Sequence, residues 1–390
     1  MIKKLKVIMV TGAYHPEING AANQCRQLVA LLKKKMDFKI LTTTRNPNLS
    51  LRGQVDGVYV HRVLLRKKTL WSYLMALLKF TTFFLSNMKY FQIIHLHGYS
   101  LKSALFTILS KIFQKSIIIK MTSIQHDDPI IIRQRGIIIK TFYSQADLYV
   151  GTNPKFEKLY QQSQLPSSGY HQIPNGVDIG RFSPVSHPEK VKLRNQLGLP
   201  ENMKVVLFVG HFSKEKCPDL LLNAWKDLVM KSFPESGLIF IGSTNPGNYE
   251  VDGELVKEFK KISKPHSNKR IFFVERTDEI EKYYQCSDIF VLPSVREGTP
   301  NALLEAMACA LPVIVSKLEG ITDWVVSDNI NGVLFEPGIR SDLGRAIRQI
   351  LSDCILAESL GRAAREAIVQ RFSMKKVAQD YLKIYHELAS

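Results

Sequence analysis

Short segments that are almost entirely apolar recur along this chain, and most are followed by a longer stretch with helical periodicity. They are rich in β-branched residues and lie at residues 6–12, 37–44, 91–97, 116–122, 146–152, 204–210, 237–242, 270–275, 289–294, 311–316 and 332–338. Apolar strands that alternate with helices are typical of parallel sheets covered on both faces. The sequence therefore predicts an α/β fold.

The chain has 390 residues, which is too long for one ordinary core. The alternation breaks at HQIPNGVDIGRFSP (171–184), where prolines and Asn-Gly indicate a connection between domains. We expect one doubly wound domain over residues 1–178 and a second over 179–372, with a C-terminal helix at about 373–390 that packs back on the first. Ligands of such sheets bind at the carboxyl ends of the strands, so a cleft between the two domains is expected.

The segment REGTPNALLEAMACALPVI (296–314) places two glutamates eight residues apart around the start of a helix. We expect Thr299 to cap this helix, with Pro300 at its first position. The free N–H groups and the positive dipole end of such a helix favour a phosphate. Because a carboxylate accepts several hydrogen bonds, Glu305 is suited to a ribose diol and Glu297 to the hydroxyls of a sugar. The alternative is an ordinary capped helix with two solvated glutamates.

Further motifs occur in order along the chain. They are ADLYVGTNP (146–154), IPNGVDIGRFSP (173–184), VLFVGHFSKEKCPDLLLNAW (206–225), YYQCSDIFVLPSVREGTPNALLEAMACALPVI (283–314) and NGVLFEPG (331–338). Over nearly its whole length the chain resembles glycosyltransferase family 4, the retaining enzymes of GT-B type. This resemblance implies two Rossmann-like doubly wound domains facing across a cleft, of which the first binds the acceptor and the second the nucleotide-sugar donor.

The resemblance also implies roles for single residues. His97, at the end of the strand 91–97, and Glu297 would be the catalytic residues; His95 lies deeper on the same face, as a core histidine would. Glu275 and Arg276 would lie near the base of the nucleotide. The donor would be bound by Gly20, His211, Lys216, Gly298, Thr299, Pro300, Asn301, Leu303, Leu304 and Glu305, with Lys216 and the Leu303 and Leu304 amides toward phosphate.

The chain departs from the family pattern at five positions. His211 stands where the family usually has arginine, and Ala21 replaces the second glycine of a pair. Cys217, Glu275 and Ala310 stand where glycine is usual. A neutral histidine contributes less charge to a phosphate site than arginine does, so these departures leave the strength of donor binding open.

We expect no cofactor and no metal. The D-x-D motif of metal-dependent transferases is absent, and Asp127 and Asp128 are adjacent in the first domain. The five cysteines lie far apart, without a C-x-x-C pair, as in reduced cytosolic proteins. The apolar run near the start is too short for the core of a signal peptide. A cytoplasmic protein is therefore expected.

The formal net charge of +18 is unevenly distributed. Residues 1–178 hold 25 Lys and Arg against 8 Asp and Glu, a net +17, whereas residues 179–390 hold 28 against 27, a net +1. Residues 64–91 combine basic residues at 66–68 with a wide apolar face of helical spacing. We expect this half to bind the anionic cytoplasmic membrane surface peripherally. Burial of the apolar face against the sheet, a transmembrane span and nucleic-acid binding are the alternatives; no nucleic-acid-binding motif is present, so nucleic acid is not expected as a partner.

The function expected is that of a metal-independent, retaining glycosyltransferase. It would move a sugar from a UDP- or GDP-sugar to a hydroxyl of a lipid-linked or polysaccharide acceptor, in the synthesis of a capsule, O-antigen, exopolysaccharide or lipopolysaccharide. The alternatives are an epimerase or phosphorylase of the same fold, and a catalytically weak sugar-nucleotide-binding scaffold at the membrane. The sugar, base, linkage, acceptor and oligomeric state do not follow from the sequence.

Overall fold

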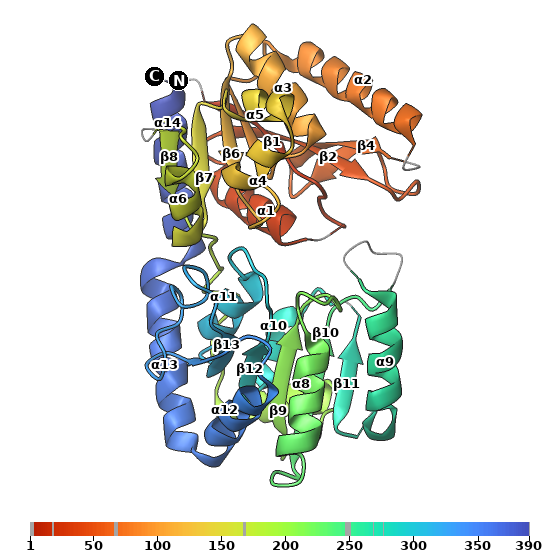
Figure 1. Ribbon diagram of the computed structural model, residues 1–390, viewed down its shortest axis with the longest axis vertical. Helices are drawn as coiled ribbons and strands as arrows, with labels where there is room; N and C mark the ends of the chain where they lie inside the picture. Colours follow the sequence, from red (N-terminus) through yellow and green to blue (C-terminus); the bar gives the residue numbers. More distant parts are fainter. Residues whose placement is uncertain are drawn as a thin grey trace. The chain divides into compact units, whose positions relative to one another are not determined.

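The computed structural model describes residues 4–389, apart from Ile18, residues 66–68, 167–168 and 246–250, Asn268 and Arg276. The chain forms two compact units, one of Met1–Gly176 with Met374–Ser390, and one of Val177–Ser373. Each is a sheet of mostly parallel strands covered by helices (Figure 1). The chain leaves the first unit after Gly176, two residues before the boundary expected from the sequence, and returns at Met374.

The first unit contains an eight-stranded sheet of order β3-β4-β2-β1-β5-β6-β7-β8. Its strands are β1 (Lys6–Val10), β2 (Asp37–Thr44), β3 (Arg52–Val55), β4 (Val58–Leu64), β5 (Ile93–His97), β6 (Ser116–Lys120), β7 (Leu148–Gly151) and β8 (Tyr170–Gln172). Its helices are α1 (Gly20–Leu32), α2 (Leu70–Asn87), α3 (Leu101–Ile112), α4 (Pro129–Gln134), α5 (Ile137–Tyr143), α6 (Pro154–Gln161) and α14 (Met374–Ala389). Helix α14 packs against α1 and β5.

The pairing of β3 with β4 is the antiparallel one in this sheet. The two strands are joined by Asp56 and Gly57, whose φ angles of 52° and 78° are both positive. An Asp-Gly pair between two strands favours such a tight hairpin turn. The sequence interpretation above missed this hairpin, although its turn signal is present.

The sequence predicts a loop over AYHPEINGAA (13–22) and a helix over NQCRQLVALLKKKM (23–36). Helix α1 begins three residues earlier, at Gly20. The Asn19 side chain accepts a hydrogen bond of 2.8 Å from the Ala22 N–H and so caps the helix. Gly20, which the sequence placed in a loop before the helix, is therefore the first residue of the helix. This corrects its expected conformation; its role toward the donor stays a prediction.

The second unit contains a six-stranded parallel sheet of order β11-β10-β9-β12-β13-β14. Its strands are β9 (Lys204–Val209), β10 (Ser236–Ile241), β11 (Ile271–Val274), β12 (Ile289–Leu292), β13 (Val313–Ser316) and β14 (Val333–Phe335). Its α-helices are α7 (His187–Gln196), α8 (Pro218–Ala224), α9 (Gly253–Ser263), α10 (Ile280–Cys286), α11 (Asn301–Ala308), α12 (Arg340–Ser352) and α13 (Cys354–Arg371). A π-helical turn (Trp225–Val229) follows α8, and a 3₁₀ turn (Lys264–His266) follows α9. Apolar side chains fill both sides of the sheet.

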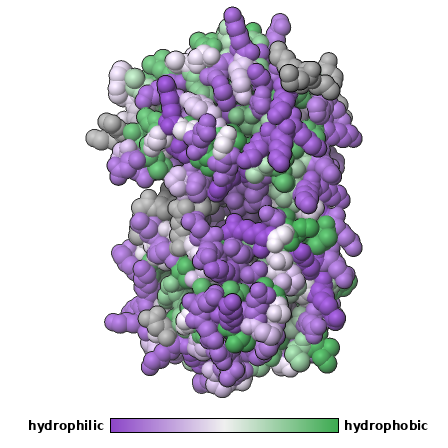
Figure 2. Space-filling view, turned by 180° about the vertical axis from the view of Figure 1, so that it is seen from behind, coloured by the Kyte–Doolittle hydropathy of each residue, from purple (hydrophilic) through white to green (hydrophobic). Residues whose placement is uncertain are grey.

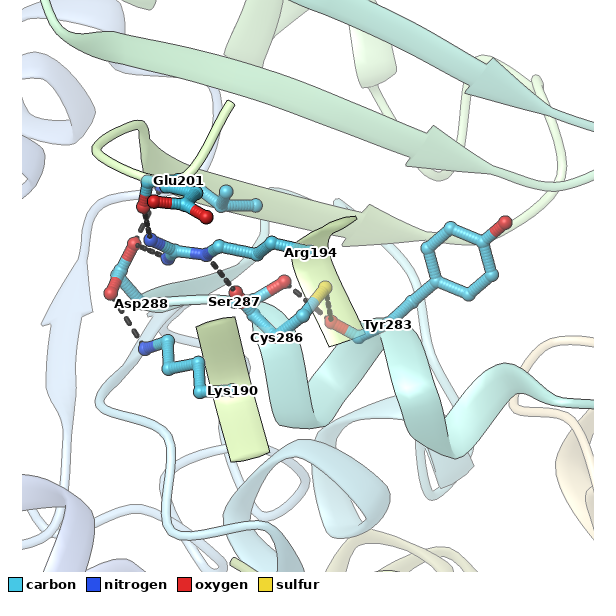
Figure 3. A network of polar contacts seen from close by, with 8 residues as sticks. Lys190, Arg194, Glu201, Tyr283, Cys286, Ser287 and Asp288 are labelled. Carbon is cyan, nitrogen blue, oxygen red and sulfur yellow. Dashed lines mark hydrogen bonds and ion pairs between the residues drawn. The ribbon is translucent and has the colours of Figure 1, made fainter. Parts of the chain in front are cut away.

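A buried ionic network connects α7 with the amino ends of β9 and β12 (Figure 3). The Asp288 carboxylate accepts bonds of 2.6 Å from both Lys190 and Arg194, and one of 2.7 Å from the Val205 N–H. The Arg194 guanidinium also donates to the backbone carbonyls of Cys286 and Glu201. The two cations hold the pKa of Asp288 below its usual value, against the opposing effect of burial. The network is thus fully hydrogen-bonded and fixes α7 to the sheet.

The face of the molecule drawn in Figure 2 is mostly hydrophilic, with scattered hydrophobic patches. In the part of the chain that the structure describes, no helix is long and apolar enough to cross a bilayer.

Candidate functional site

Helix α11 starts one residue later than the sequence predicted. Its N-cap is Pro300, whose backbone is extended, and its first residue is Asn301. The predicted cap at Thr299, with Pro300 in the first turn, is therefore wrong. The Pro300 carbonyl accepts bonds of 3.1 and 3.3 Å from the Leu303 and Leu304 amides. Those two amides are thus used inside the helix, and their assignment to phosphate stays a prediction.

Glu297 lies in the loop between β12 and α11 and is only 7% exposed. Both of its carboxylate oxygens accept hydrogen bonds from Lys216 Nζ, at 2.6 and 2.7 Å. A carboxylate taken out of water requires such a partner. The structure therefore joins the residue assigned to the sugar with the residue assigned to the phosphate, 81 positions apart in the chain.

The loop that carries Lys216 is attached to the loop that carries Glu297. The Val295 N–H donates to the Glu215 carbonyl at 2.9 Å, and the Arg296 guanidinium contacts the Glu215 carboxylate. Gly298 and Thr299 follow directly, with Thr299 buried. The carboxyl ends of β9 and β12 thus carry two loops that are fixed to each other.

Glu305 lies in α11 and is 8% exposed. The Tyr284 hydroxyl, from α10, donates to its Oε2 atom at 2.9 Å. Burial raises the pKa of Glu305 to about 7, against the Tyr284 bond and the charge of Arg181, which lower it. Since both Glu297 and Glu305 are buried, the alternative of two solvated glutamates is wrong.

This raised pKa predicts how the stability of the fold depends on pH. Glu305 titrates near 4.5 when unperturbed and near 7 in the folded chain. Between these values the unfolded chain loses the proton first, so rising pH removes up to about 3 kcal/mol of stability. Glu305→Gln should therefore be more stable than the native protein above about pH 7, and should lose that advantage near pH 4. Thermal unfolding of both proteins across this range is the measurement; a difference that is constant with pH would contradict the assignment.

Glycines hold the strand ends beside this site close together. A Cβ atom on Gly242, which follows β10, would lie 1.9 Å from the carbonyl oxygen of Gly210, which follows β9. Gly210 immediately precedes His211, which is partly buried. On the far side of β10, Glu275 is exposed and accepts a bond of 3.2 Å from the Thr244 N–H. Arg276, the other residue expected near the base, lies outside the described residues.

Two of the departures from the family pattern have a shared conformation. Cys217 and Ala310, which stand where glycine is usual, have φ angles of 48° and 58°. This left-handed region costs a residue with a Cβ atom roughly 1 kcal/mol or more. The left-handed backbone explains why glycine is usual at these two positions. This chain adopts the same conformation with cysteine and alanine.

Replacing Ala310 by glycine should raise the free energy of unfolding by about 1 kcal/mol, because the left-handed conformation then carries no steric penalty. Ala308→Gly, two residues earlier and inside α11, is the matched control. It should lower the free energy of unfolding by a similar amount, since glycine weakens a helix. Urea denaturation measures both. Destabilisation by both substitutions would contradict the prediction.

In the first unit, His97 is the last residue of β5 and is 7% exposed. Its ring stacks on that of His95, with centroids 4.4 Å apart. His95 is fully buried, and its Nδ1 atom lies 2.7 Å from the Tyr385 hydroxyl. His95 is thus a core histidine, as expected, but its Nε2 atom has no hydrogen-bond partner in the described residues. Neither ring nitrogen of His97 has a hydrogen-bond partner within the described residues.

The sequence interpretation missed two residues of the site. Tyr284 lies in the motif 283–314, but its hydrogen bond to Glu305 arises from the packing of α10 against α11 and is not visible in the sequence. Ser294 follows β12 and is fully buried, with an Oγ atom that contacts no partner in the described part of the chain. A buried hydroxyl at the carboxyl end of a parallel strand is available to a ligand.

Across the residues that the structure describes, no three His, Cys, Asp or Glu side chains lie together as a metal ion would require. The expectation of metal-independent chemistry stays a prediction.

Comparison with known proteins identifies the second unit. Residues 189–367 match the family described as glycosyl transferases group 1. This match lies within the second unit and covers less than half of the chain.

Relatives of this chain include the D-inositol 3-phosphate glycosyltransferase of Corynebacterium jeikeium, with 28% identity over 65% of this chain and 60% of that protein. Another is the UDP-Gal:alpha-D-GlcNAc-diphosphoundecaprenol alpha-1,3-galactosyltransferase of Escherichia coli, with 30% identity over 55% of this chain and 54% of that protein. The chain thus spans less than two thirds of the length of both relatives. The Anabaena protein HepE, solved in complex with UDP and glucose, superposes with a TM-score of 0.80 at 18% identity, over 98% of this chain and all of HepE. The expected fold class, GT-B with two Rossmann-like α/β domains, is confirmed.

Proposed function

We propose that this protein is a glycosyltransferase, which transfers a sugar, with retained configuration, from a nucleotide diphosphate sugar to a hydroxyl group. The observation that carries the proposal is the ion pair of half-buried Lys216 with buried Glu297 beside the N-terminus of α11, with buried Glu305 in the same helix. The names of the relatives support the donor class, since the E. coli enzyme uses a UDP-sugar and HepE was solved with UDP.

In the proposed reaction Glu305 binds the ribose of the donor and Glu297 its sugar. Lys216 and the N-terminus of α11 stabilise the negative charge that develops on the leaving diphosphate, as His211 does by a hydrogen bond. Such stabilisation requires no divalent ion, so metal independence is part of the proposal. The acceptor proton passes to the departing phosphate oxygen, because the site presents no evident side-chain nucleophile. His97 acts at the reacting sugar.

The test is the melting temperature of the full chain with UDP, GDP, ADP or CMP, in the presence of EDTA. A nucleotide at a hundred times its dissociation constant should stabilise the fold by about 2.7 kcal/mol. Lys216→Met should weaken this shift for the diphosphate that binds, whereas Lys214→Met should not. Lys214 is the matched control, because its side chain is exposed two residues away. No shift with any nucleotide, or equal shifts in the two variants, would overturn the donor site.

Turnover separates the remaining alternatives. A transferase consumes the nucleotide sugar faster when an acceptor is added. An epimerase converts the sugar without an acceptor, and a scaffold binds the nucleotide without turnover. Nuclear magnetic resonance of the donor sugar, with and without acceptor, distinguishes the three.

The finer part of the proposal concerns the acceptor, which we take to be a lipid-linked or polysaccharide hydroxyl at the cytoplasmic face of a membrane. Helix α2 supports it. Only four residues of this helix are buried, namely Ala76, Phe80, Phe83 and Phe84. The opposite side exposes a stripe of large apolar residues that includes Trp71 and Leu78, 72% and 61% exposed. Packing against the sheet therefore explains the apolar residues on one side of α2, but not those on the exposed side.

The charge around α2 favours an anionic bilayer as the partner of this stripe. Between Asp56 and Asp127 the sequence holds ten basic residues and no acidic one. Lys79, Lys89 and Lys111 are among them and are exposed, so they can face a charged surface. Each basic residue near an anionic surface contributes on the order of 1 kcal/mol, and the apolar stripe adds its burial among the lipid chains. Both contributions favour peripheral binding of the first unit.

Vesicle flotation tests this part. The full chain should float with phosphatidylglycerol vesicles at low salt, less at high salt, and hardly with phosphatidylcholine alone. The double variant Leu74→Glu/Leu78→Glu should lose most of the binding. Ile355→Glu alters an exposed apolar residue of the second unit and is the control. Equal binding by all three proteins would exclude α2 as the membrane contact.

A further inference from the structure

Lys120 and His97 end two neighbouring strands of the first unit. Parallel pairing of β5 with β6 sets them side by side in register. Residues in register on adjacent strands project to the same face of a sheet. On this face, which α14 covers, the Lys120 ammonium lies 5.6 Å from the centre of the Tyr381 ring, and His95 stacks on His97. The two side chains therefore belong to one cluster at the carboxyl edge of the sheet.

Lys120 is a buried cation without a counter-ion. It is 2% exposed and forms no ion pair and no side-chain hydrogen bond with the described residues. Burial lowers the pKa of Lys120 to about 8, while Cys25 on α1 raises it slightly. A buried ammonium with only an aromatic ring near it is costly to keep. The fold thus carries a positive charge here that no described residue of the chain neutralises.

His97 adds unused hydrogen-bonding capacity at the same place. Burial and the charges of His95 and Lys120 lower its pKa well below the usual range, so the ring is neutral near pH 7. A neutral imidazole has one N–H donor and one acceptor nitrogen. Both nitrogens are buried and lack a partner in the described residues. Buried polar atoms almost always have a hydrogen-bond partner, so the two nitrogens of His97 are unusual.

The Asp127 carboxylate, beside the residue that follows His97, does not neutralise Lys120 or bind His97. Asp127 lies close to Gly98, the residue after His97. Its two oxygens accept bonds from the Thr122 N–H and hydroxyl and from the Ser123 N–H, at 2.7 to 3.1 Å. Along the same sheet edge, a Cβ atom on Gly12, after β1, would meet no atom within 4 Å. The edge thus has open space near the end of β1.

We propose that Lys120 and His97 bind an anionic group, a phosphate monoester or a carboxylate, carried by the acceptor of the sugar. The anion neutralises the positive charge of the Lys120 ammonium, and the His97 ring donates one hydrogen bond to it. The binding of an anion at Lys120 and His97 does not depend on the proposed function. Only the statement that the acceptor carries this anion rests on it. The proposal adds a chemical class, because the acceptor then carries a negative group close to the hydroxyl that receives the sugar.

The experiment measures the melting temperature of the full chain against inorganic phosphate and against acetate, at an ionic strength held constant with sodium chloride. The native protein and Lys34→Met, an exposed lysine of the same unit, should show a saturable shift with at least one anion. In Lys120→Met the apparent dissociation constant of that anion should rise at least tenfold. The anion that acts distinguishes a phosphate from a carboxylate acceptor. Without any anion, Lys120→Met should melt no lower than the native protein, because it removes an uncompensated buried charge.

Lys120→Arg retains the charge and should retain the shift, which keeps the test valid if the methionine variant folds poorly. Equal anion shifts in native protein and Lys120→Met, or no shift with either anion in the native protein, would overturn the proposal. The nucleotide-induced shift should be unchanged in Lys120→Met, since it arises in the second unit. If the native protein and all variants lacked the nucleotide-induced shift, the donor site would be wrong. The anion shifts would still test the binding of an anion by Lys120 and His97.

Discussion

Glu305→Ala is expected to slow sugar transfer at least a hundredfold and to remove the nucleotide-induced rise in melting temperature. A carboxylate that accepts two hydrogen bonds from a ribose contributes about 3 kcal/mol or more, which corresponds to this factor in rate. The exposed fraction of Glu305 is only 8%, so water cannot easily replace it. Donor consumption and nucleotide binding are measured on the same preparation.

Two further variants separate binding from folding. Glu366→Ala makes the same change at an exposed position of α13 and should leave both measurements unchanged. Glu305→Gln keeps an acceptor for the Tyr284 hydroxyl and removes the charge, so it should fold normally and still lose most activity. Near-native turnover by Glu305→Ala would show that this glutamate does not hold the donor.

Asp288→Ala should lower the free energy of unfolding by about 3–5 kcal/mol, because it leaves the Lys190 and Arg194 cations without their carboxylate. The side chain of Arg194 is almost completely buried and cannot turn toward solvent. The effect should depend on pH. Since the folded pKa of Asp288 is lowered, its contribution is complete above the unfolded pKa and disappears as pH falls through the folded value.

Urea denaturation at pH 7 and at about pH 3 measures this prediction. Glu201→Ala is the control, because Arg194 contacts the backbone carbonyl of Glu201 rather than its exposed carboxylate. The control should change the free energy of unfolding by less than about 1 kcal/mol. If Asp288→Ala had no larger effect than the control, the network would be a surface feature without structural weight.

The fold class was predictable because alternation of strand and helix leaves a strong period in the sequence. Element ends were harder, since they depend on single hydrogen bonds. Asn19 caps α1, so this helix starts before the apolar pattern of its sequence. The N-cap of α11 is Pro300 and not Thr299. The β3–β4 hairpin was missed because β3 has only four residues, two of them exposed, and so carries little strand signal.

Within the candidate site, the sequence located what lies in one motif and could not foresee what packing adds. Glu297 and Glu305 were recognisable from their spacing. The contact of Glu297 with Lys216, and that of Glu305 with Tyr284, connect residues from different elements. Burial is also a property of the folded chain, so neither the raised pKa of Glu305 nor the uncompensated charge of Lys120 was visible in the sequence.

The return of the chain to its first unit at Met374 has a consequence for biosynthesis. Tyr385, on α14, contacts His95, which the ribosome makes 290 residues earlier. At about 5–20 residues per second, the intervening second unit takes on the order of ten to forty seconds to emerge. During that time the nascent first unit exposes the apolar face that α14 later covers. The part of the protein that is made first is therefore finished last, and the nascent chain at this stage exposes apolar surface of the kind that chaperones bind.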